Sequence, residues 1–225
     1  MDSELWGILT DSFGKILMAG IRTTIPLTII AFSFGLIIAL ITALVQYAKV
    51  PVLRQIARFY IWLIRGTPLL VQLAIIFYGL PALGIRVDAF AAAAVGLSIC
   101  EGAYMAETLR GSLEAVDPGQ SEAGYCVGLS FWQIMAQVVL PQAFRTAFPA
   151  LSNSLISLLK DTSLAANITV VEMFMTTQRI AGRTYRFMPL YIEVAIVYLI
   201  FCSIITMIQH RVEKRLNRYQ AKEAH

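Results

Sequence analysis

The sequence predicts an all-α integral membrane protein with five transmembrane helices, formed by residues 1–225 as a single domain. Apolar residues make up 58% of the chain and charged residues only 14%, and the mean hydropathy is +0.70. A soluble domain is typically about 45–50% apolar and about 25% charged. Several segments stay apolar over about 20 residues, the length that crosses a bilayer. Basic residues gather between these segments and at the C-terminal end, where they indicate membrane topology rather than nucleic-acid binding.

The chain is expected to start with a short helix on the membrane surface. The apolar residues within 1–17 suit one face of a helix, which indicates an interfacial element leading into the first span. Asp2, Glu4 and Asp11 argue against a cleavable signal peptide, whose start would be basic. The first span covers residues 23–48, a stretch without any charged residue.

Four further spans complete the expected set of five within residues 18–210. They cover residues 59–83, 89–109, 148–168 and 190–208. The second span contains a single charge, Arg65, which can reach the membrane interface and is expected to act as an anchor. The third and fourth spans are less clean, because each contains two charged residues.

Lysine and arginine residues outside the spans set the expected orientation. They follow the first span, flank the long loop between the third and fourth spans, and fill a basic tail at 211–225. Five spans put these three groups on one side, the cytoplasm, and leave the acidic N-terminus outside. Arg179, Arg183 and Arg186 disagree, because the same topology places them outside, but the other groups outnumber them.

Residues 117–141 form a polar loop with signals for two short helices. Asp117 is an N-cap, followed by proline at the first helical position and glutamine at the third. Gly128 ends this helix, Ser130 caps a second one, and Pro141 is expected to end the second helix. The loop is therefore predicted to be a structured cytoplasmic element rather than a passive linker.

The spacing within this loop resembles the EAA motif of ABC importer permeases. That pattern reads Glu-Ala-Ala, three residues, Gly, nine residues, Ile, one residue and Leu-Pro, and every spacing is met here. The matching residues are Glu122, Ala123, Gly124, Gly128, Val138, Leu140 and Pro141. Glycine in place of the second alanine is expected to weaken the helix by about 0.5–1 kcal/mol. The resemblance implies that the loop is a coupling helix, which docks into a cytoplasmic ATPase and transmits its closure.

Further stretches are similar to polar amino-acid permeases of the histidine, glutamine, arginine and cystine type. They are residues 65–72, 78–81, 140–143 and 160–165. The resemblance covers roughly residues 23–209 and implies the type I ABC importer permease fold in the bacterial inner membrane. It also implies two cytoplasmic ATPase subunits and an extracytoplasmic solute-binding protein. A second permease subunit is implied as well, with an identical copy favoured over a paralogue.

Charged side chains inside the expected spans are candidates for the substrate pathway, because burying an ion in hydrocarbon costs at least about 2.5–3.5 kcal/mol. Neighbours on a helix point about 100° apart, so Lys160 and Asp161 each need a partner elsewhere. An amino acid brings both an ammonium and a carboxylate. The candidate pathway residues are Glu101, Lys160, Asp161, Thr162 and Ser163.

A structural interpretation of these charges is equally open, since polar groups in a membrane must be satisfied whether or not substrate binds. In this interpretation Asp161 caps a restart of its helix and Lys160 neutralises Glu101. Glu107 and Arg110 stand three residues apart near the end of the third span, and they are expected to form a structural ion pair.

The expected function is that of a membrane-spanning permease subunit in an ATP-driven importer, which receives a polar amino acid from a solute-binding protein. Cystine is favoured, and glutamine, arginine and histidine stay open. The chain contains no Gly-x-x-x-x-Gly-Lys-[Ser/Thr] phosphate loop, so it is not expected to be an enzyme. ATP and Mg are expected on the partner ATPase, with no cofactor in this chain.

Two alternatives come from other classes. An ion-coupled secondary amino-acid transporter would favour internal repeats, which the five spans lack. A membrane-bound enzyme would need a reactive cluster, but His210 and His225 both lie in the tail. Cys100, Cys126 and Cys202 fit neither a zinc site nor a disulfide framework. No catalytic or metal site is therefore expected.

Overall fold

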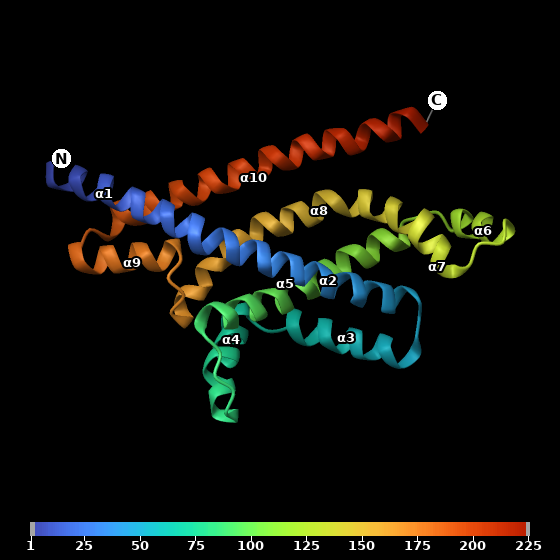
Figure 1. Cartoon of the computed structure of the whole chain (residues 1–225), viewed down its shortest axis with the longest axis horizontal. Helices are drawn as coiled ribbons and strands as arrows, with labels where there is room; N and C mark the ends of the chain where they lie inside the picture. The colour runs from blue at the N-terminus through green and yellow to red at the C-terminus, as the bar shows by residue number, and fades with distance from the viewer. Residues whose placement is uncertain (1–2, 224–225) are drawn as a thin grey trace.

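The computed structural model describes residues 3–223, and within that range every regular element is a helix (Figure 1). The α-helices are α1 (Ser3–Ala19), α2 (Ile25–Tyr47), α3 (Pro51–Arg65), α4 (Leu69–Ala74), α5 (Ala89–Glu114), α6 (Pro118–Cys126), α7 (Phe131–Ile134), α8 (Leu140–Asp161), α9 (Met173–Thr184) and α10 (Phe187–Glu223). Short π- and 3-10-helical segments join several of them: η1 (Gly20–Thr24), η2 (Ile75–Gly79), η3 (Leu80–Leu83), η4 (Met135–Val139) and η5 (Thr162–Ile168).

The long helices run along the longest axis of the molecule, with α6 and α7 at one end and α9 at the other (Figure 1). Within residues 3–223, three segments are long and apolar enough to cross a membrane: Glu4–Tyr47, Ala89–Glu114 and Phe187–Arg215. A fourth is obtained when the bent pair Pro51–Arg65 and Leu69–Leu83 counts as one span. The chain is therefore an all-α integral membrane protein.

The N-terminal helix continues into the first span without a break, because α1 passes through the π-helical segment η1 directly into α2. At a rise of about 1.5 Å per residue, the 44 residues of Glu4–Tyr47 exceed the roughly 30 Å of the hydrocarbon core. Gly20 lies at the junction, where a Cβ atom would approach the Phe201 ring to 2.6 Å and the Met173 sulfur to 2.7 Å. Only glycine allows this close approach of α9 and α10 to the junction.

The second expected span, residues 59–83, is not one straight helix, which corrects the sequence-based expectation. Here α3 and the segment Leu69–Leu83 meet at 102°. Pro68 lies in the connection and cannot donate the N–H that would continue the helix. The side-chain amide of Gln72 donates to the carbonyl of Ile64 at 2.8 Å, which satisfies a carbonyl left free at the end of α3. The bend is thus held by hydrogen bonding.

The fourth expected span also differs, because its helix begins earlier than residue 148. Pro141 lies in the first turn of α8 rather than ending a helix, since α7, η4 and α8 follow one another without interruption. A proline is tolerated there because the π-helical segment η4 directly before α8 adjusts the backbone hydrogen bonding around a residue that lacks an N–H. With η5, α8 covers residues 148–168, but it is not among the apolar segments that pass for a membrane span. Its stripe of serine, asparagine and charged side chains explains this.

Small residues allow the central pair of helices, α2 and α5, to pack closely. A Cβ atom on Gly35 of α2 would lie 3.2 Å from the backbone oxygen of Ser98, and one on Gly102 of α5 would lie 2.9 Å from Ile38. Buried alanines such as Ala39 line the same contact. Close backbone approach is the usual basis of helix association in membranes, where lipid provides no hydrophobic drive between helices.

A fully buried carboxylate, Glu172, holds the start of α9 against α10. It accepts hydrogen bonds from the backbone N–H groups of Phe174 (2.8 Å) and Met175 (2.7 Å), and from the Tyr198 hydroxyl (2.8 Å). Burial raises the pKa of this carboxyl, while these hydrogen bonds lower it in part. Because the folded-state pKa is raised, the stabilising contribution of this group declines as pH increases through that value.

We expect Glu172→Ala to lower the free energy of unfolding by about 2–4 kcal/mol, because it removes a helix cap and the carboxylate that accepts from the Tyr198 hydroxyl. Glu172→Gln, which keeps an acceptor, should cost less. Thermal unfolding of the purified chain in detergent measures both, with the exposed Glu4→Ala as control. A loss for Glu172→Ala no larger than that of the control would contradict the structural role.

Candidate functional site

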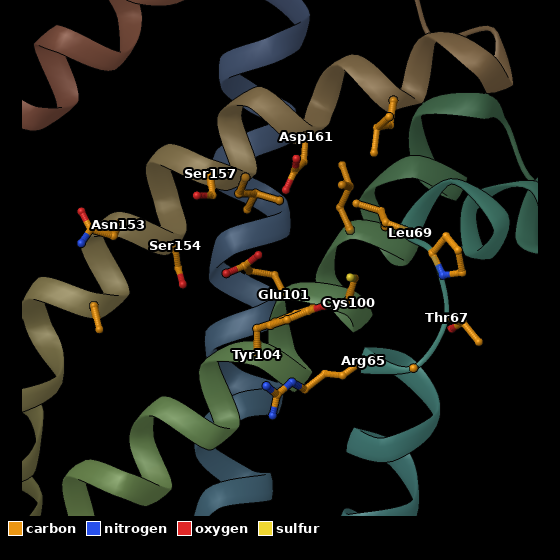
Figure 2. Close-up of a pocket in the computed structure, with 16 residues that line it drawn as sticks. Arg65, Thr67, Leu69, Cys100, Glu101, Tyr104, Asn153, Ser154, Ser157 and Asp161 are labelled. Atoms are coloured by element: carbon orange, nitrogen blue, oxygen red, sulfur yellow. The ribbon is translucent and has the colours of Figure 1, made fainter.

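A cavity of about 770 Å³ lies between the α3–α4 bend, α5 and α8 (Figure 2). Its volume is within the range of about 300–1,000 Å³ that small-molecule sites occupy. The bend, α5, α8 and η5 all contribute to its lining: Arg65, Gly66, Thr67, Pro68, Leu69, Leu97, Cys100, Glu101, Tyr104, Ala150, Asn153, Ser154, Ser157, Leu158, Asp161 and Leu164. Charged and hydroxyl side chains thus converge on one space inside the membrane bundle.

Two carboxylates point into this cavity from different helices, Glu101 from α5 and Asp161 from α8 (Figure 2). Glu101 is only 7% exposed, and its Oε1 atom has no hydrogen-bond partner within the described part of the chain. A buried polar atom without a partner costs about 1–3 kcal/mol, and more when it is charged. The Oε1 atom of Glu101 is therefore available to accept a hydrogen bond from a bound molecule.

Arg65 brings a positive charge to the same cavity. Its guanidinium carbon lies 5.2 Å from the centroid of the Tyr104 ring, a cation–π contact that positions the side chain. The α3–α4 bend directs Arg65 toward the cavity, so the side chain is more than the interfacial anchor that the sequence suggested. Both signs of charge are therefore present around one space.

The structure separates the five candidate pathway residues. Glu101 and Asp161 share the 770 Å³ cavity, whereas Lys160 and Ser163 line another space of about 600 Å³ between α8, η5, α9 and α10. Thr162 is fully buried and donates to the Leu159 carbonyl at 2.7 Å, so its hydroxyl is already used. Successive helical residues point about 100° apart, which explains why this sequence run faces several directions.

The structural alternatives for these charges are not supported. Asp161 makes no side-chain capping hydrogen bond at the start of η5, and Lys160 lines a different space from Glu101. By contrast, the ion pair expected between Glu107 and Arg110 is confirmed at 3.0 Å.

Sequence reasoning missed the polar residues of α8 that line the cavity. Asn153, Ser157 and Asp161 recur every fourth residue, which places them on one face of a helix. Ser154 lies beside this stripe and faces Glu101 across the cavity (Figure 2). The four-residue spacing was the available signal, but uncharged side chains in an otherwise apolar span did not stand out.

The loop at 117–141 forms the expected short helix α6, and the second helix starts as expected at α7 but continues through η4 into α8. Asp117 accepts from the Gly119 N–H at 2.8 Å, which confirms the first cap. Ser130 and Gln133 form a reciprocal capping box at the start of α7. Gly128 adopts a positive φ of 83° between the two helices, a left-handed conformation that glycine favours.

The end of this two-helix tip exposes an apolar surface. Tyr125 is 53% exposed, Val127 76% and Trp132 70%. Glu122 and Ala123 are also exposed on α6. Large apolar side chains gathered at the end of a helical hairpin indicate a protein-docking surface, which we call the tip surface and define as Tyr125, Val127 and Trp132.

Other residues of the motif support the tip from inside. Gly124 is buried, and a Cβ atom there would lie 2.7 Å from Cγ1 of Ile134. Glycine therefore lets α6 pack on α7, an advantage that outweighs its low helix propensity. Leu140 and Pro141 lie in the first turn of α8, where Leu140 packs against the core cluster of α2, α5 and α8. They connect the tip to the membrane bundle.

We expect Gly124→Ala to destabilise the chain by about 1–3 kcal/mol through overpacking against Ile134. Ile134→Ala alone should also destabilise, because it empties a buried position. The loss of stability in the double variant should be smaller than the sum of the two single losses, by about 1 kcal/mol or more. Thermal unfolding of the four forms measures this coupling, and strict additivity would contradict the contact.

An all-α membrane bundle with a charged internal cavity and an exposed helical tip defines a membrane transport subunit. The family of binding-protein-dependent transport system inner membrane components matches residues 31–218. This match covers most of the chain, and the chain therefore belongs to that family.

Several relatives are similar over nearly the whole chain. The L-cystine transport system permease protein TcyB of Bacillus subtilis (strain 168) is 48% identical over 96% of this chain and 93% of its own length. The L-cystine transport system permease protein TcyL of the same organism is 37% identical over 95% and 92%. The probable amino-acid ABC transporter permease protein YckA, also from B. subtilis, is 40% identical over 89% and 88%.

Solved structures agree with this assignment. A crystal structure of an amino acid ABC transporter with histidines matches with a TM-score of 0.84 and 33% identity, covering 96% of this chain and 99% of the other. An inward-facing MetNI methionine ABC transporter matches with a TM-score of 0.76 over the same shares, and at 19% identity it supports the fold alone.

The family assignment made from the loop spacing is thus confirmed, rather than the ion-coupled alternative. The chain is an ABC importer permease subunit with the type I fold, a multi-pass protein of the inner membrane. In such systems a separate ATPase subunit hydrolyses ATP and a solute-binding protein delivers the substrate.

Proposed function

We propose that this permease translocates a polar amino acid and that cystine is its principal substrate, with glutamine, arginine and histidine as less favoured cargo. The two relatives described as L-cystine permeases support cystine, one of them at 48% identity. The substrate site is the 770 Å³ cavity, and the observation that carries this proposal is the unpaired, buried Oε1 atom of Glu101.

The charges around the cavity fit an amino-acid zwitterion. Glu101 and Asp161 accept hydrogen bonds from ammonium groups, and Arg65 offers a forked donor to a carboxylate. Cystine has two ammonium groups, so carboxylates on α5 and α8 give each ammonium its own partner. Asn153, Ser154 and Ser157 supply the neutral polar contacts that fix the orientation of a ligand.

A second permease subunit covers the face of α8 and α10 that carries Lys160. Lys160 is exposed beside the largely apolar space that Tyr191, Val194 and Leu199 line, within the expected membrane region. An ammonium facing lipid is costly, so a protein partner is the better cover. We favour an identical copy over a paralogue, which gives a homodimeric permease with two ATPase subunits.

The tip surface docks onto the ATPase. The distribution of basic residues predicts the orientation in the membrane: α6, α7 and the C-terminal tail are cytoplasmic, and the N-terminus is outside. ATP and Mg bind to the ATPase subunits, and their closure moves the tip and the adjoining α8. The residues that transmit this movement are Glu122, Ala123, Gly124, Gly128, Leu140 and Pro141.

A competition assay tests the substrate. Cells that depend on this permease are given radiolabelled cystine, with unlabelled glutamine, arginine or histidine in excess. We expect saturable cystine uptake that these competitors reduce only weakly. Uptake of one of the other amino acids in preference to cystine would overturn the cystine assignment and leave the amino-acid cavity in place.

A further inference from the structure

A second polar groove, separate from the cavity, lies where the end of α2 and helices α3 and α5 meet. Its volume is about 340 Å³, and it includes Gln46 from α2, Arg54 and Arg58 from α3, and Glu107 and Arg110 from α5. None of these residues lines the substrate cavity. The groove is therefore a polar site separate from the substrate cavity.

The charges in this groove are not balanced. Arg110 is held by two carboxylates, Glu107 at 3.0 Å and Glu114 at 2.7 Å. Arg54 and Arg58 stand four residues apart on α3, and neither makes an ion pair among the described side chains. Arg110 and its two carboxylates together carry a charge of −1, so Arg54 and Arg58 bring the groove to a net charge of +1. Their two guanidinium groups can bind an anion with forked geometry.

The groove opens beside an exposed apolar surface of α3. Three large apolar side chains of α3 are exposed: Ile56 at 59%, Phe59 at 60% and Trp62 at 69%. Trp62 also lines the groove itself. Tryptophan is enriched at the boundary between hydrocarbon and headgroups. An occupant with an apolar tail beside α3 and an anionic group in the groove matches both surfaces.

We propose that this groove binds the headgroup of an anionic phospholipid carrying free hydroxyls, such as phosphatidylglycerol. The phosphodiester pairs with Arg54 and Arg58, while the carboxylates of Glu107 and Glu114 accept from the glycerol hydroxyls. Basic pockets between transmembrane helices on the cytoplasmic side are typical sites for such lipids. The cytoplasmic placement rests on the orientation proposed above, but lipid binding is measured independently of transport.

Native mass spectrometry of the purified full-length chain tests this site. The probes are phosphatidylglycerol and phosphatidylethanolamine in mixed micelles, and the variant is Arg54→Gln/Arg58→Gln. We expect retention of phosphatidylglycerol to fall about 30-fold, since each juxtamembrane arginine contributes about fivefold in affinity. The matched control is Arg179→Gln/Arg183→Gln, which removes two exposed arginines with the same spacing from α9 and should retain phosphatidylglycerol like the wild type.

Several results would overturn the inference. Equal losses in both variants would indicate general surface charge, and equal retention of phosphatidylethanolamine would exclude an anionic headgroup. Displacement of the lipid by inorganic phosphate at matching concentration would indicate a free-anion site. Arg54→Lys/Arg58→Lys preserves both charges without the forked geometry and should retain more lipid than the glutamine variant but less than the wild type, which separates binding from misfolding.

Discussion

Replacing Glu101 with glutamine, or Asp161 with asparagine, should reduce ATP-driven cystine uptake at least about 30-fold while both variants still assemble with the ATPase. Each change keeps the size of the side chain and removes one negative charge from the cavity. Truncating one partner of a buried charge pair costs about 2–5 kcal/mol, and about 2 kcal/mol corresponds to a factor of 30. Uptake into cells that depend on this permease measures the effect.

The matched control is Asp88→Asn, which removes a carboxylate from the start of α5 outside the cavity. Asparagine and aspartate are equally good N-caps, so this helix start is preserved. Uptake should therefore stay at the wild-type level in the control. Wild-type kinetics in Asp161→Asn and Glu101→Gln would show that the two carboxylates are structural and would remove the cavity as the substrate site.

The second large effect is expected at the tip surface. Replacing Tyr125 and Trp132 with alanine should reduce recovery of the ATPase with the tagged chain at least about 30-fold, because exposed aromatic residues at an interface commonly contribute 2 kcal/mol or more each. Gly128→Asp places a side chain and a charge at a positive φ of 83°, and it should also reduce recovery of the ATPase. Affinity purification from native membranes with mass spectrometry measures recovery.

Met188→Ala serves as the control for this experiment, since Met188 is 72% exposed in the first turn of α10. Figure 1 shows the start of α10 at the end of the molecule opposite α6 and α7. It should recover the ATPase like the wild type. Full recovery with Tyr125→Ala/Trp132→Ala would place the ATPase contact elsewhere on the chain. Loss of recovery in the control as well would indicate a general defect of the exposed apolar surface rather than a specific tip.

Local signals in the sequence were sufficient for the tip. Asp117, Ser130 and Gly128 act through their own backbone neighbours, so caps and the helix break could be predicted without knowing the tertiary structure. Gly124 is different, because its value comes from the packing of Ile134, ten residues away in the sequence. The low helix propensity of glycine predicts a weakened helix at this position, whereas in the structure the missing side chain allows α6 to pack closely on Ile134.

The cavity depended on tertiary geometry that periodicity does not contain. Glu101 and Asp161 stood out because charges are rare in apolar spans, and both line the cavity. A straight second span predicts an interfacial Arg65, whereas at the end of α3, beside the bend, this side chain lines the cavity. Helical geometry predicts that Lys160 and Asp161 point apart, but only the tertiary structure shows that they line two different spaces.

The most direct test of the substrate site is an experimental structure of the assembled importer with cystine bound. We predict density for cystine between Glu101, Asp161 and Arg65, with one ammonium group at each carboxylate. Cystine seated instead beside Lys160 and Ser163, with the cavity at Glu101 empty, would contradict the assignment and move the pathway to the interface between permease subunits.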